Sequence, residues 1–449
     1  MRRFITLLFA VLVPCTMLHA AKPNILVLFA DDLGNSGVGY QEGAEKEIKT
    51  PNIDSIAANG VRCTAGYVTA PQCSPSRAGL ISGRYQQRFG HEENHNQPVM
   101  LMKGGKTIGD QFKAAGYATG HFGKWHLGYE TREQAPKEFV EKGDWMAPTQ
   151  HGFDESFGFH DLEKPAPDPK RKRQPKQAQD DRVFARKTAD FIERHKDKPW
   201  CVYLAFHAPH GPHTSERKYT SRYADAPKDR RGALAAMALL DDAVGIVLTK
   251  LRELNTEEDT LIFFIGDNGG TRYEGRSVKR WQQGTENKPF RGGKGNSIEG
   301  GIRVPYLVQW KGHLPAGKTY DRPVISLDVI PTALGAAGAT PLADYELDGV
   351  NLLPFFKGEK TPDPHEALYW RWRREQAVRS GDWKLVRSED KHFGHKGWAL
   401  IDLKTDIRER TDLTAKHPEI AKELQQRWNS WNASHPPIGP EFKSDETEE

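Results

Sequence analysis

The sequence predicts an α/β fold. We expect a doubly wound, mixed but mostly parallel sheet sandwiched by helices, and a smaller C-terminal α+β subdomain with an antiparallel sheet and a closing helix. Two observations predict this. Up to about residue 345, continuous apolar runs alternate with amphipathic segments of helical period, which is typical of α/β folds. After that point, short segments alternate apolar and polar residues, which is typical of an antiparallel sheet with one face in water.

The first 21 residues form a separate segment. Arg2 and Arg3 precede an apolar run, residues 4–18, that ends in His-Ala-Ala, the order of a secretory signal peptide. The run is shorter than the ~20 residues that a membrane span needs, and it contains Pro14. We therefore expect export to the periplasm or the cell exterior and no transmembrane span, because no later segment looks apolar enough to cross a bilayer.

Composition excludes some classes of function. Residues 1–21 carry two cations and no acid, which leaves 62 Lys and Arg against 60 Asp and Glu. This near balance argues against a general nucleic-acid binder, which would be strongly basic. Of the four cysteines, Cys15 lies in the leader, and Cys63 and Cys201 are either a disulfide or two buried thiols.

Four apolar runs predict strands buried on both faces, and each run ends in polar residues. In open α/β sheets, ligands bind outside the carboxyl ends of the strands, so these polar residues should meet at one edge. The runs and the groups that follow them are residues 24–30 before Asp31 and Asp32, 117–122 before Lys124 and His126, 200–206 before His210, and 261–265 before Asp267 and Asn268.

Helices are expected between these strands. Residues 107–115 have a cap and an amphipathic turn, and residues 234–251 carry an apolar stripe that we interpret as core. A short helix follows Cys73, with Ser74 as N-cap, Pro75 at the first helical position and Gly83 at its end. In the C-terminal part, strands are expected within 369–373, 377–379, 383–387 and 398–403, a helix over 418–431, and a disordered acidic tail over 441–449.

Cys73 and the polar strand ends are the candidate functional groups. A helix N-terminus favours an anion, and Arg77 adds a cation beside Cys73. Asp31, Asp32, Asp267 and Asn268 offer hard oxygen ligands, which favour calcium or magnesium over zinc, although each pair alone would also suit a turn. The basic residues Lys124, His126, His210 and Lys294 complete the set, and Lys294 lies in a Gly-rich loop that lets the backbone approach a ligand closely.

The motifs that contain these residues resemble those of the type I sulfatases, in the same order along the chain. They are Cys-x-Pro-x-Arg with its Leu-x-x-Gly-Arg tail (73–84), Pro-Asn-Ile-Leu-x-x-x-x-Asp-Asp (23–32), Gly-Lys-Trp-His-Leu-Gly (123–128), Pro-His-x-Pro-His (209–213), Gly-Asp-Asn-Gly (266–269) and Gly-Gly-Lys-x-x-x-x-Glu-Gly-Gly-x-Arg-Val-Pro (292–305). Asp-Gly-Val-Asn-Leu-Leu-Pro from Asp348 and Gly-Asp-Trp-Lys-Leu from Gly381 fit as well. The resemblance covers residues 22 to about 431.

The resemblance implies a mechanism and a set of roles. Cys73 would be oxidised to formylglycine by a maturation enzyme, and the hydrate would attack sulfur, helped by Asp267 and Arg77. Asp31, Asp32, Asp267, Asn268 and the modified Cys73 would hold Ca²⁺, with Mg²⁺ less favoured. Lys124, Lys294 and His210 would bind the sulfate oxygens, His210 or Lys294 would act as general acid, and His126 would take the proton that expels sulfate.

The resemblance therefore implies an exported sulfuric-ester hydrolase that acts on a sulfated sugar or polysaccharide, with residues 22–345 as catalytic domain and 346–449 as C-terminal subdomain. One alternative is a phosphate or phosphonate ester hydrolase on the same scaffold, and a second is a non-catalytic protein that binds sulfated glycans. His91 and His95, with Glu92, Glu93 and Asn96, are either sugar contacts or a polar surface loop. The basic stretch 161–181 is either a solvated loop or a rim that contacts a polyanion.

Overall fold

The computed structural model describes residues 22–44, 46–94, 104–128, 137, 147–158, 180–211, 213, 216–271, 285–390 and 393–437. The predicted signal peptide, the stretch 161–179, His95, Asn96 and the acidic tail lie outside these residues.

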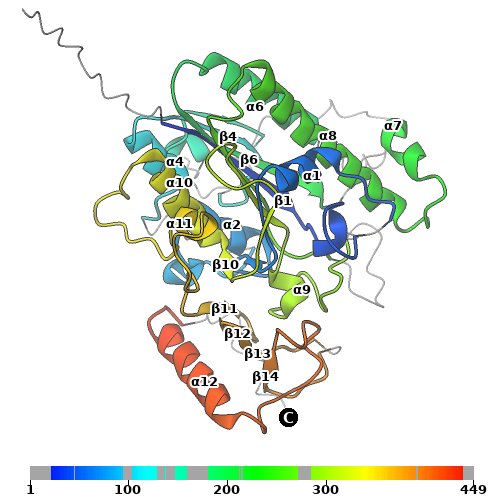
Figure 1. Cartoon of the computed structure of the whole chain (residues 1–449), viewed down its shortest axis with the longest axis vertical. Coiled ribbons are helices and arrows are strands. Elements are labelled where there is room, and N and C mark those ends of the chain that lie inside the picture. The colour runs from blue at the N-terminus through cyan, green and yellow to red at the C-terminus, as the bar shows by residue number, and fades with distance from the viewer. Residues whose placement is uncertain are drawn as a thin grey trace, which may run out of the picture.

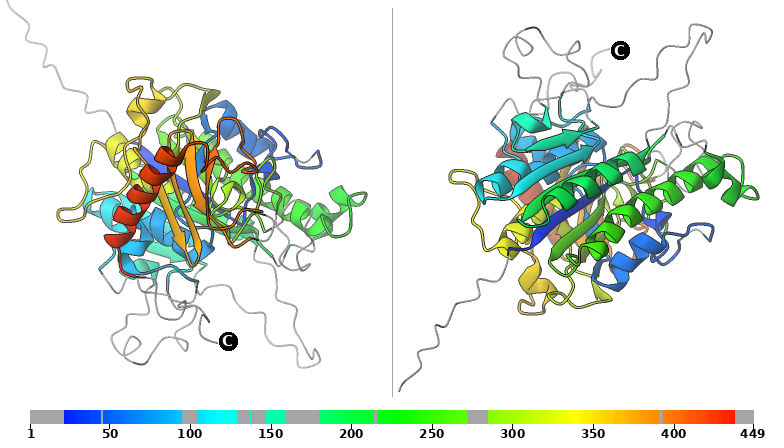
Figure 2. Two further views of the ribbon diagram at one scale, coloured as in Figure 1. Left: turned by 90° about the horizontal axis from the view of Figure 1, so that it is seen from below. Right: turned by 90° about the horizontal axis from the view of Figure 1, so that it is seen from above.

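Strand β1 (Asn24–Asp31) lies between two apolar cores, because its side chains alternate between the faces of the sheet. Ile25, Val27 and Phe29 pack into one core. Leu26, Leu28 and Ala30 pack into the other. Each core needs its own cover of helices, which explains the three-layer arrangement in Figures 1 and 2.

The central sheet has the order β5-β4-β6-β1-β7-β8-β2-β9 among the described residues. The four predicted strands are neighbours and parallel: β4 (Ala118–Gly123), β6 (Trp200–Pro209), β1 and β7 (Thr260–Gly266). β5 (Glu155–Phe157) extends this block in parallel, β8 (Tyr306–Gln309) is antiparallel to β7 and β2 (Val61–Cys63), and β9 (Lys318–Tyr320) is parallel to β2. The predicted mixed, mostly parallel sheet is confirmed.

Helices cover both faces of this sheet. One face carries α2 (Cys73–Ser82), α4 (Ile108–Ala114), α10 (Val329–Ala337) and α11 (Leu353–Phe356). The other carries α1 (Pro51–Ala58), α6 (Asp181–Arg194) and α8 (Arg231–Glu253), with the short α7 (Arg217–Thr220) beside α8. Short 3-10 turns (35–37, 86–89, 148–150, 221–223 and 326–328) and the pair β3 (Gly66–Tyr67) and β10 (Val324–Ile325) complete this part.

Helix α2 begins two residues earlier than its sequence predicts. Gln72, in an extended conformation, precedes the first helical residue, Cys73. Ser74 is therefore inside the helix and is not its N-cap, because its hydroxyl bonds to the carbonyl of His126 instead. The predicted end is correct: Gly83 adopts a left-handed conformation with φ of 65°. The shift places Cys73 within the first turn, where backbone N–H groups lack helical partners.

Helix α8 is long and apolar enough, by length and composition, to cross a membrane, so the expectation that no later segment reaches this level was wrong. Its predicted stripe, from Leu234 to Leu251, is buried, and the helix packs against α6, α1 and β6. These contacts identify α8 as a core helix of this domain.

The C-terminal part contains the antiparallel sheet β11 (Leu368–Trp372), β12 (Glu375–Ser380), β13 (Trp383–Arg387) and β14 (Trp398–Asp402), and then α12 (Pro418–Ala433). The predicted wet face was wrong. One face packs against residues of the first part, such as Tyr67 and Ile302, and α12 covers the other face through Leu424 and Trp428. Figure 2, left, shows α12 lying across the strands. The division at residue 345 stays a prediction.

Cys63 and Cys201 are free and buried, which agrees with the alternative of two buried thiols. Burial raises the pKa of both thiols, so they stay protonated and unreactive.

A buried ion network joins the two parts of the chain. Lys384 of β13 lies 2.8 Å from a carboxylate oxygen of Glu299 and 2.8 Å from one of Glu409, and all three side chains are fully buried. Glu299 is the first residue of α9 (Glu299–Ile302), in the loop region after Lys294, and also accepts hydrogen bonds from Arg303 and the Tyr67 hydroxyl. Arg379 of β12 donates to the same hydroxyl. The network therefore fixes α9 to the C-terminal sheet.

Replacing Lys384 should be costly for stability. Lys384→Met leaves two buried carboxylates without their shared cation, and we expect the free energy of unfolding to fall by about 3–5 kcal/mol. Urea unfolding followed by tryptophan fluorescence measures this change. Lys404→Met, at an exposed position after β14, is the control and should change stability by less than about 0.5 kcal/mol. Equal stabilities of the two variants would contradict the role of the network.

Candidate active site

The polar residues that follow the four central strands meet at one edge of the sheet, as the topology requires. Asp31 is the last residue of β1, and Asp32 follows it with a left-handed φ of 58°. Asp267 follows β7, and its backbone N–H donates to the carbonyl of Ala30 across the strand pair. A backbone hydrogen bond therefore joins the ends of the two strands.

Three buried carboxylates converge at this edge. Ligand atoms of Asp31, Asp32, Asp267 and Cys73 all lie within 4.8 Å of one another. Asn268 donates from Nδ2 to Asp32 Oδ1 over 2.8 Å. Its Oδ1 is buried and has no hydrogen-bond partner among the described residues. A buried carbonyl oxygen without a donor, beside carboxylates that repel one another, fits a hard cation such as Ca²⁺ or Mg²⁺.

Three cationic side chains face the carboxylates. Lys124 Nζ lies 2.5 Å from Asp31 Oδ2, Lys294 Nζ lies 2.7 Å from Asp32 Oδ1, and Arg77 Nη2 lies 2.6 Å from Asp267 Oδ2. Burial alone would raise the pKa of Asp31, but Lys124 and the other nearby cations hold it well below its usual range. Burial and the neighbouring Asp31 raise the pKa of Asp267 to about 7. Three carboxyl groups therefore face three cationic side chains in this site.

Cys73 lies between these two groups. Its Sγ is 3.2 Å from Asp31 Oδ1 and 3.0 Å from Lys294 Nζ. Burial, and then the carboxylates of Asp267 and Asp31, raise the pKa of the thiol well above its usual value. An unmodified Cys73 is therefore a protonated thiol and a poor nucleophile, in spite of its place at a helix N-terminus.

Close backbone contacts place the two lysines. Gly123 has a φ of 95°, and a Cβ there would lie 2.0 Å from the carbonyl oxygen of Ala205, so only glycine fits. The N–H of Lys124 donates to that same carbonyl over 2.8 Å. The N–H of Lys294 donates to the carbonyl of Gly270 over 3.1 Å, and that of the next residue, Gly295, donates to the carbonyl of Pro71 over 2.8 Å. The lysine loop is thus fixed both to the end of β7 and to the segment before Cys73.

The two histidines differ in exposure. His126 has a left-handed φ of 59°, and burial, Lys124 and Arg77 lower its pKa well below the usual value. It is therefore a neutral imidazole that can accept a proton. The side chain of His210 is 37% exposed, and its Nε2 lies 3.7 Å from Asp32 Oδ2. His210 is the histidine that a molecule entering from solvent can reach.

The described residues among the candidate sugar contacts, His91, Glu92 and Glu93, are buried and paired with other side chains. His91 is fully buried and its Nε2 lies 2.8 Å from Ser74 Oγ, which favours a structural role. Burial lowers its pKa to about 4. Glu92 pairs with Arg371, and Glu93 pairs with Arg373.

Sequence reasoning missed the residue that holds the end of β6. The carboxylate of Asp181 accepts hydrogen bonds from the N–H groups of His207 and Ala208, over 2.9 and 2.8 Å. These residues directly precede Pro209 and His210. The only signal in the sequence is an acidic residue at a helix start, and this signal cannot identify a partner 26 residues away.

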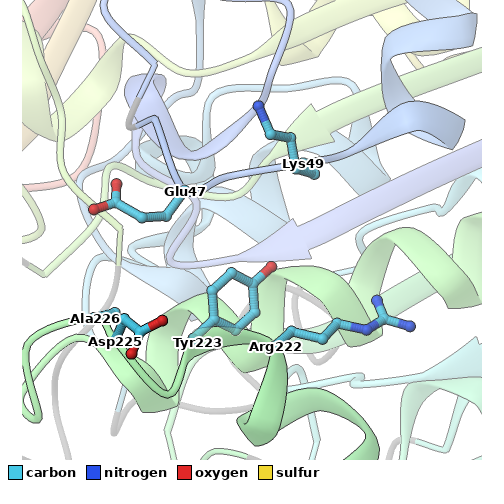
Figure 3. A pocket seen from close by; sticks show the side chains of 6 residues that line it. All are labelled: Glu47, Lys49, Arg222, Tyr223, Asp225 and Ala226. Carbon is cyan, nitrogen blue, oxygen red and sulfur yellow. The ribbon is translucent and has the colours of Figure 1, made fainter.

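A pocket of about 430 Å³ lies elsewhere on the protein. It is lined by Glu47, Lys49, Arg222, Tyr223, Asp225 and Ala226 (Figure 3). Glu47 and Lys49 come from the segment before α1 and face the other four across the opening. None of the six belongs to the acidic cluster, so this pocket is separate from the candidate site.

Comparisons with known proteins place this geometry in a family. The sulfatase family model matches residues 23–339, and the model for the C-terminal part of N-sulphoglucosamine sulphohydrolase matches residues 294–434. The chain is 29% identical to N-acetylgalactosamine-6-sulfatase of Homo sapiens over 78% of this chain and 72% of that protein. It is 30% identical to arylsulfatase A of Homo sapiens over 91% of this chain and 82% of that protein.

Solved structures agree. The crystal structure of Ps i-CgsB in complex with k-i-k-neocarrahexaose has a TM-score of 0.78 and 29% identity, and covers 93% of this chain and 94% of its own. The phosphonate monoester hydrolase of Agrobacterium radiobacter shares the fold, with a TM-score of 0.63 and 19% identity over 92% of this chain and 96% of its own.

Asp181 should matter for stability through the end of β6. Asp181→Ala leaves two backbone N–H groups near β6 without an acceptor, and we expect a loss of about 1–3 kcal/mol in the free energy of unfolding. Asp190→Ala, at an exposed position of the same helix, is the matched control. Chemical unfolding of both variants tests this, and an Asp181 variant no less stable than the control would show that these bonds are dispensable.

Proposed function

Since the chain belongs to the sulfatase family and is a sulfatase, we propose that it removes sulfate from a sulfated carbohydrate, using a formylglycine made from Cys73 and a bound calcium ion. The observation that carries the proposal is the convergence of Lys124, Lys294 and His210 on the position of Cys73, beside three buried carboxylates.

The position of Cys73 supports conversion of this residue, because its Sγ lies among the buried carboxylates and 3.0 Å from Lys294 Nζ. When formed, the aldehyde hydrate supplies one hydroxyl for attack on sulfur and a second whose deprotonation releases sulfate. The fully buried Arg77 holds Asp267 at 2.6 Å and fixes its carboxylate beside position 73. A formylglycine-generating enzyme is the partner that this proposal requires.

The cations would neutralise the sulfate group. Lys124 and Lys294 have little exposed surface and approach position 73 from two different loops, so they would hold sulfate oxygens with little reorganisation. His210 is exposed enough to meet the departing sugar oxygen and would protonate it as general acid, with Lys294 as the alternative donor. His126, held neutral, would accept the proton that accompanies sulfate release.

The metal would be held by Asp31, Asp32, Asp267 and Asn268 together with the modified residue 73. Asn268 Oδ1, which has no hydrogen-bond partner among the described residues, and the hard oxygen donors support a hard divalent cation, for which we propose calcium, with magnesium less favoured. A divalent cation supplies positive charge for polarising a sulfate oxygen.

Similarity to N-acetylgalactosamine-6-sulfatase and to a protein crystallised with a neocarrahexaose supports a sulfated sugar as substrate. Residues 1–21 support export, to the periplasm or the cell exterior.

A panel of defined sulfated sugars, with 4-nitrophenyl sulfate and 4-nitrophenyl phosphate, tests the function. We expect sulfate release from at least one sugar and a higher kcat/KM for the sulfate than for the phosphate ester. Faster phosphate release would favour the phosphoester alternative.

Cys73→Ser should lower turnover by more than about a thousandfold while sugar binding persists, since an effect of this size is typical for removal of a nucleophile. Unchanged turnover would contradict the formylglycine mechanism.

Calcium should stabilise the folded protein. At a calcium concentration 100 times the dissociation constant, binding adds about 2.7 kcal/mol to the free energy of unfolding, so the thermal midpoint should rise and then fall again with EGTA. Asp32→Asn should abolish this shift. Asp225→Asn, at an exposed acidic position away from the cluster, should retain it. A shift that Asp32→Asn leaves intact would place the metal elsewhere.

A further inference from the structure

The turn between β11 and β12 lies beside the loop that carries Lys294. We propose that Arg373, in this turn, forms a sugar-binding subsite with Gln72 and Asn94, and that the subsite hydrogen-bonds the hydroxyl groups of the sugar unit next to the scissile sulfate. The inference rests on the proposed function and adds a specificity-determining residue from the C-terminal sheet. Figure 1 shows this sheet packed below the first part of the chain, near α9.

The location follows from Gly295. It is the neighbour of Lys294, whose Nζ is 3.0 Å from Cys73 Sγ. A Cβ on Gly295 would lie 3.5 Å from Gln72 Nε2 and 3.6 Å from Cζ3 of Trp372. The residue before Cys73, the residue after Lys294 and the last residue of β11 therefore meet at one point. Gln72 directly precedes Cys73, the proposed nucleophile position, and Gly295 directly follows Lys294, which we propose binds sulfate.

Two partly exposed amide side chains border this point. Asn94 Nδ2 donates to Gln72 Oε1 over 3.1 Å, and Asn94 Oδ1 accepts from the N–H of Ser74 over 3.1 Å. Both residues thus attach to the first turn of α2, and each keeps part of its surface in solvent. Amide groups held in this way are typical hydrogen-bonding partners of sugar hydroxyls in a binding site.

Arg373 is exposed but firmly held. Its side chain is 48% exposed, and its Nε and Nη2 lie 2.7 and 3.2 Å from the two carboxylate oxygens of Glu93, which is only 6% exposed. Its guanidinium also stacks over the Trp372 ring, 4.8 Å from the ring centre. A guanidinium fixed on two sides loses little conformational freedom when it binds a ligand.

The backbone at Arg373 is unusual. Trp372 pairs with Glu375, so Arg373 and Arg374 form a two-residue hairpin turn, and Arg373 has a left-handed φ of 54°. Turns of this kind favour Asn, Asp or Gly, because a long side chain with a Cβ is strained there. An arginine at a strained position beside the loop of Lys294 indicates a function for its side chain.

The charge of the turn selects the ligand. Glu93 compensates the charge of Arg373, and Glu92 compensates that of Arg371 behind it. A second sulfate at Arg373 would also approach the Glu93 carboxylate, whereas a hydroxyl can donate to one group and accept from the other. The subsite therefore fits the hydroxyls of a neutral sugar ring better than a second anionic group.

The experiment compares two probes: the sulfated sugar with the highest kcat/KM in the panel and 4-nitrophenyl sulfate, which lacks a sugar. Arg373→Gly relieves the strained φ and keeps the turn. We expect it to lower the ratio of the two kcat/KM values (sugar over aryl) by tenfold or more, through a higher KM for the sugar. Arg374→Ala, in the same turn and paired with Glu389, is the matched control and should leave the ratio unchanged.

A second variant tests the charge argument. Glu93→Gln leaves Arg373 uncompensated, so the preference should shift at least threefold towards a sugar with an additional sulfate. An unchanged ratio in Arg373→Gly, or a proportional loss on both probes, would overturn the subsite, and no shift in Glu93→Gln would overturn its assignment to neutral hydroxyls. Failure of the wild-type protein to release sulfate from any sugar would instead overturn the proposed function on which the subsite rests.

Discussion

The convergence of buried carboxylates at the ends of β1 and β7 is the constraint on which the rest of the site depends. Asp31, Asp32 and Asp267 cannot share this volume as anions unless positive charge is brought to them. The fold supplies that charge from three different places, namely the second turn of α2, the end of β4 and the Gly-rich loop after β7. The same cations that allow the carboxylates to be buried are the ones that a sulfate ester would meet. The same cations therefore stabilise the buried carboxylates and supply the positive charge that an anionic substrate would need.

Much of this could be predicted from sequence because the signals are local. A run such as 24–30 has no alternation, so it must be buried on both faces, and parallel strands necessarily gather their C-terminal residues at one edge. This reasoning was sufficient to bring Asp31, Lys124, His210 and Asp267 together. The motifs then identified Cys73 and Lys294, which no periodicity could have placed.

The features that sequence did not reveal depend on partners far along the chain. Ser74 has the chemistry of an N-cap, but the carbonyl of His126 competes for its hydroxyl. In the C-terminal sheet, the alternation of apolar and polar residues predicts one face in water, but α12 covers that face. Asp181 and Arg373 act through residues 26 and 280 positions away. In each case the side chain suggested an interaction, but only the three-dimensional fold determined which one is made.

The Lys384 network has a consequence for how the two parts of the chain can evolve. Its two carboxylates come from α9 and from residue 409, while its lysine comes from β13, so three separate segments share one charge balance. A C-terminal sheet transferred from another family member would therefore destabilise this chain unless it also placed a cation next to Glu299 and Glu409. Divergence is easier in the turn between β11 and β12, which lies beside the loop of Lys294 but outside that charge balance. The buried network therefore constrains the framework, whereas the hairpin turn, in which we propose the sugar subsite, can vary.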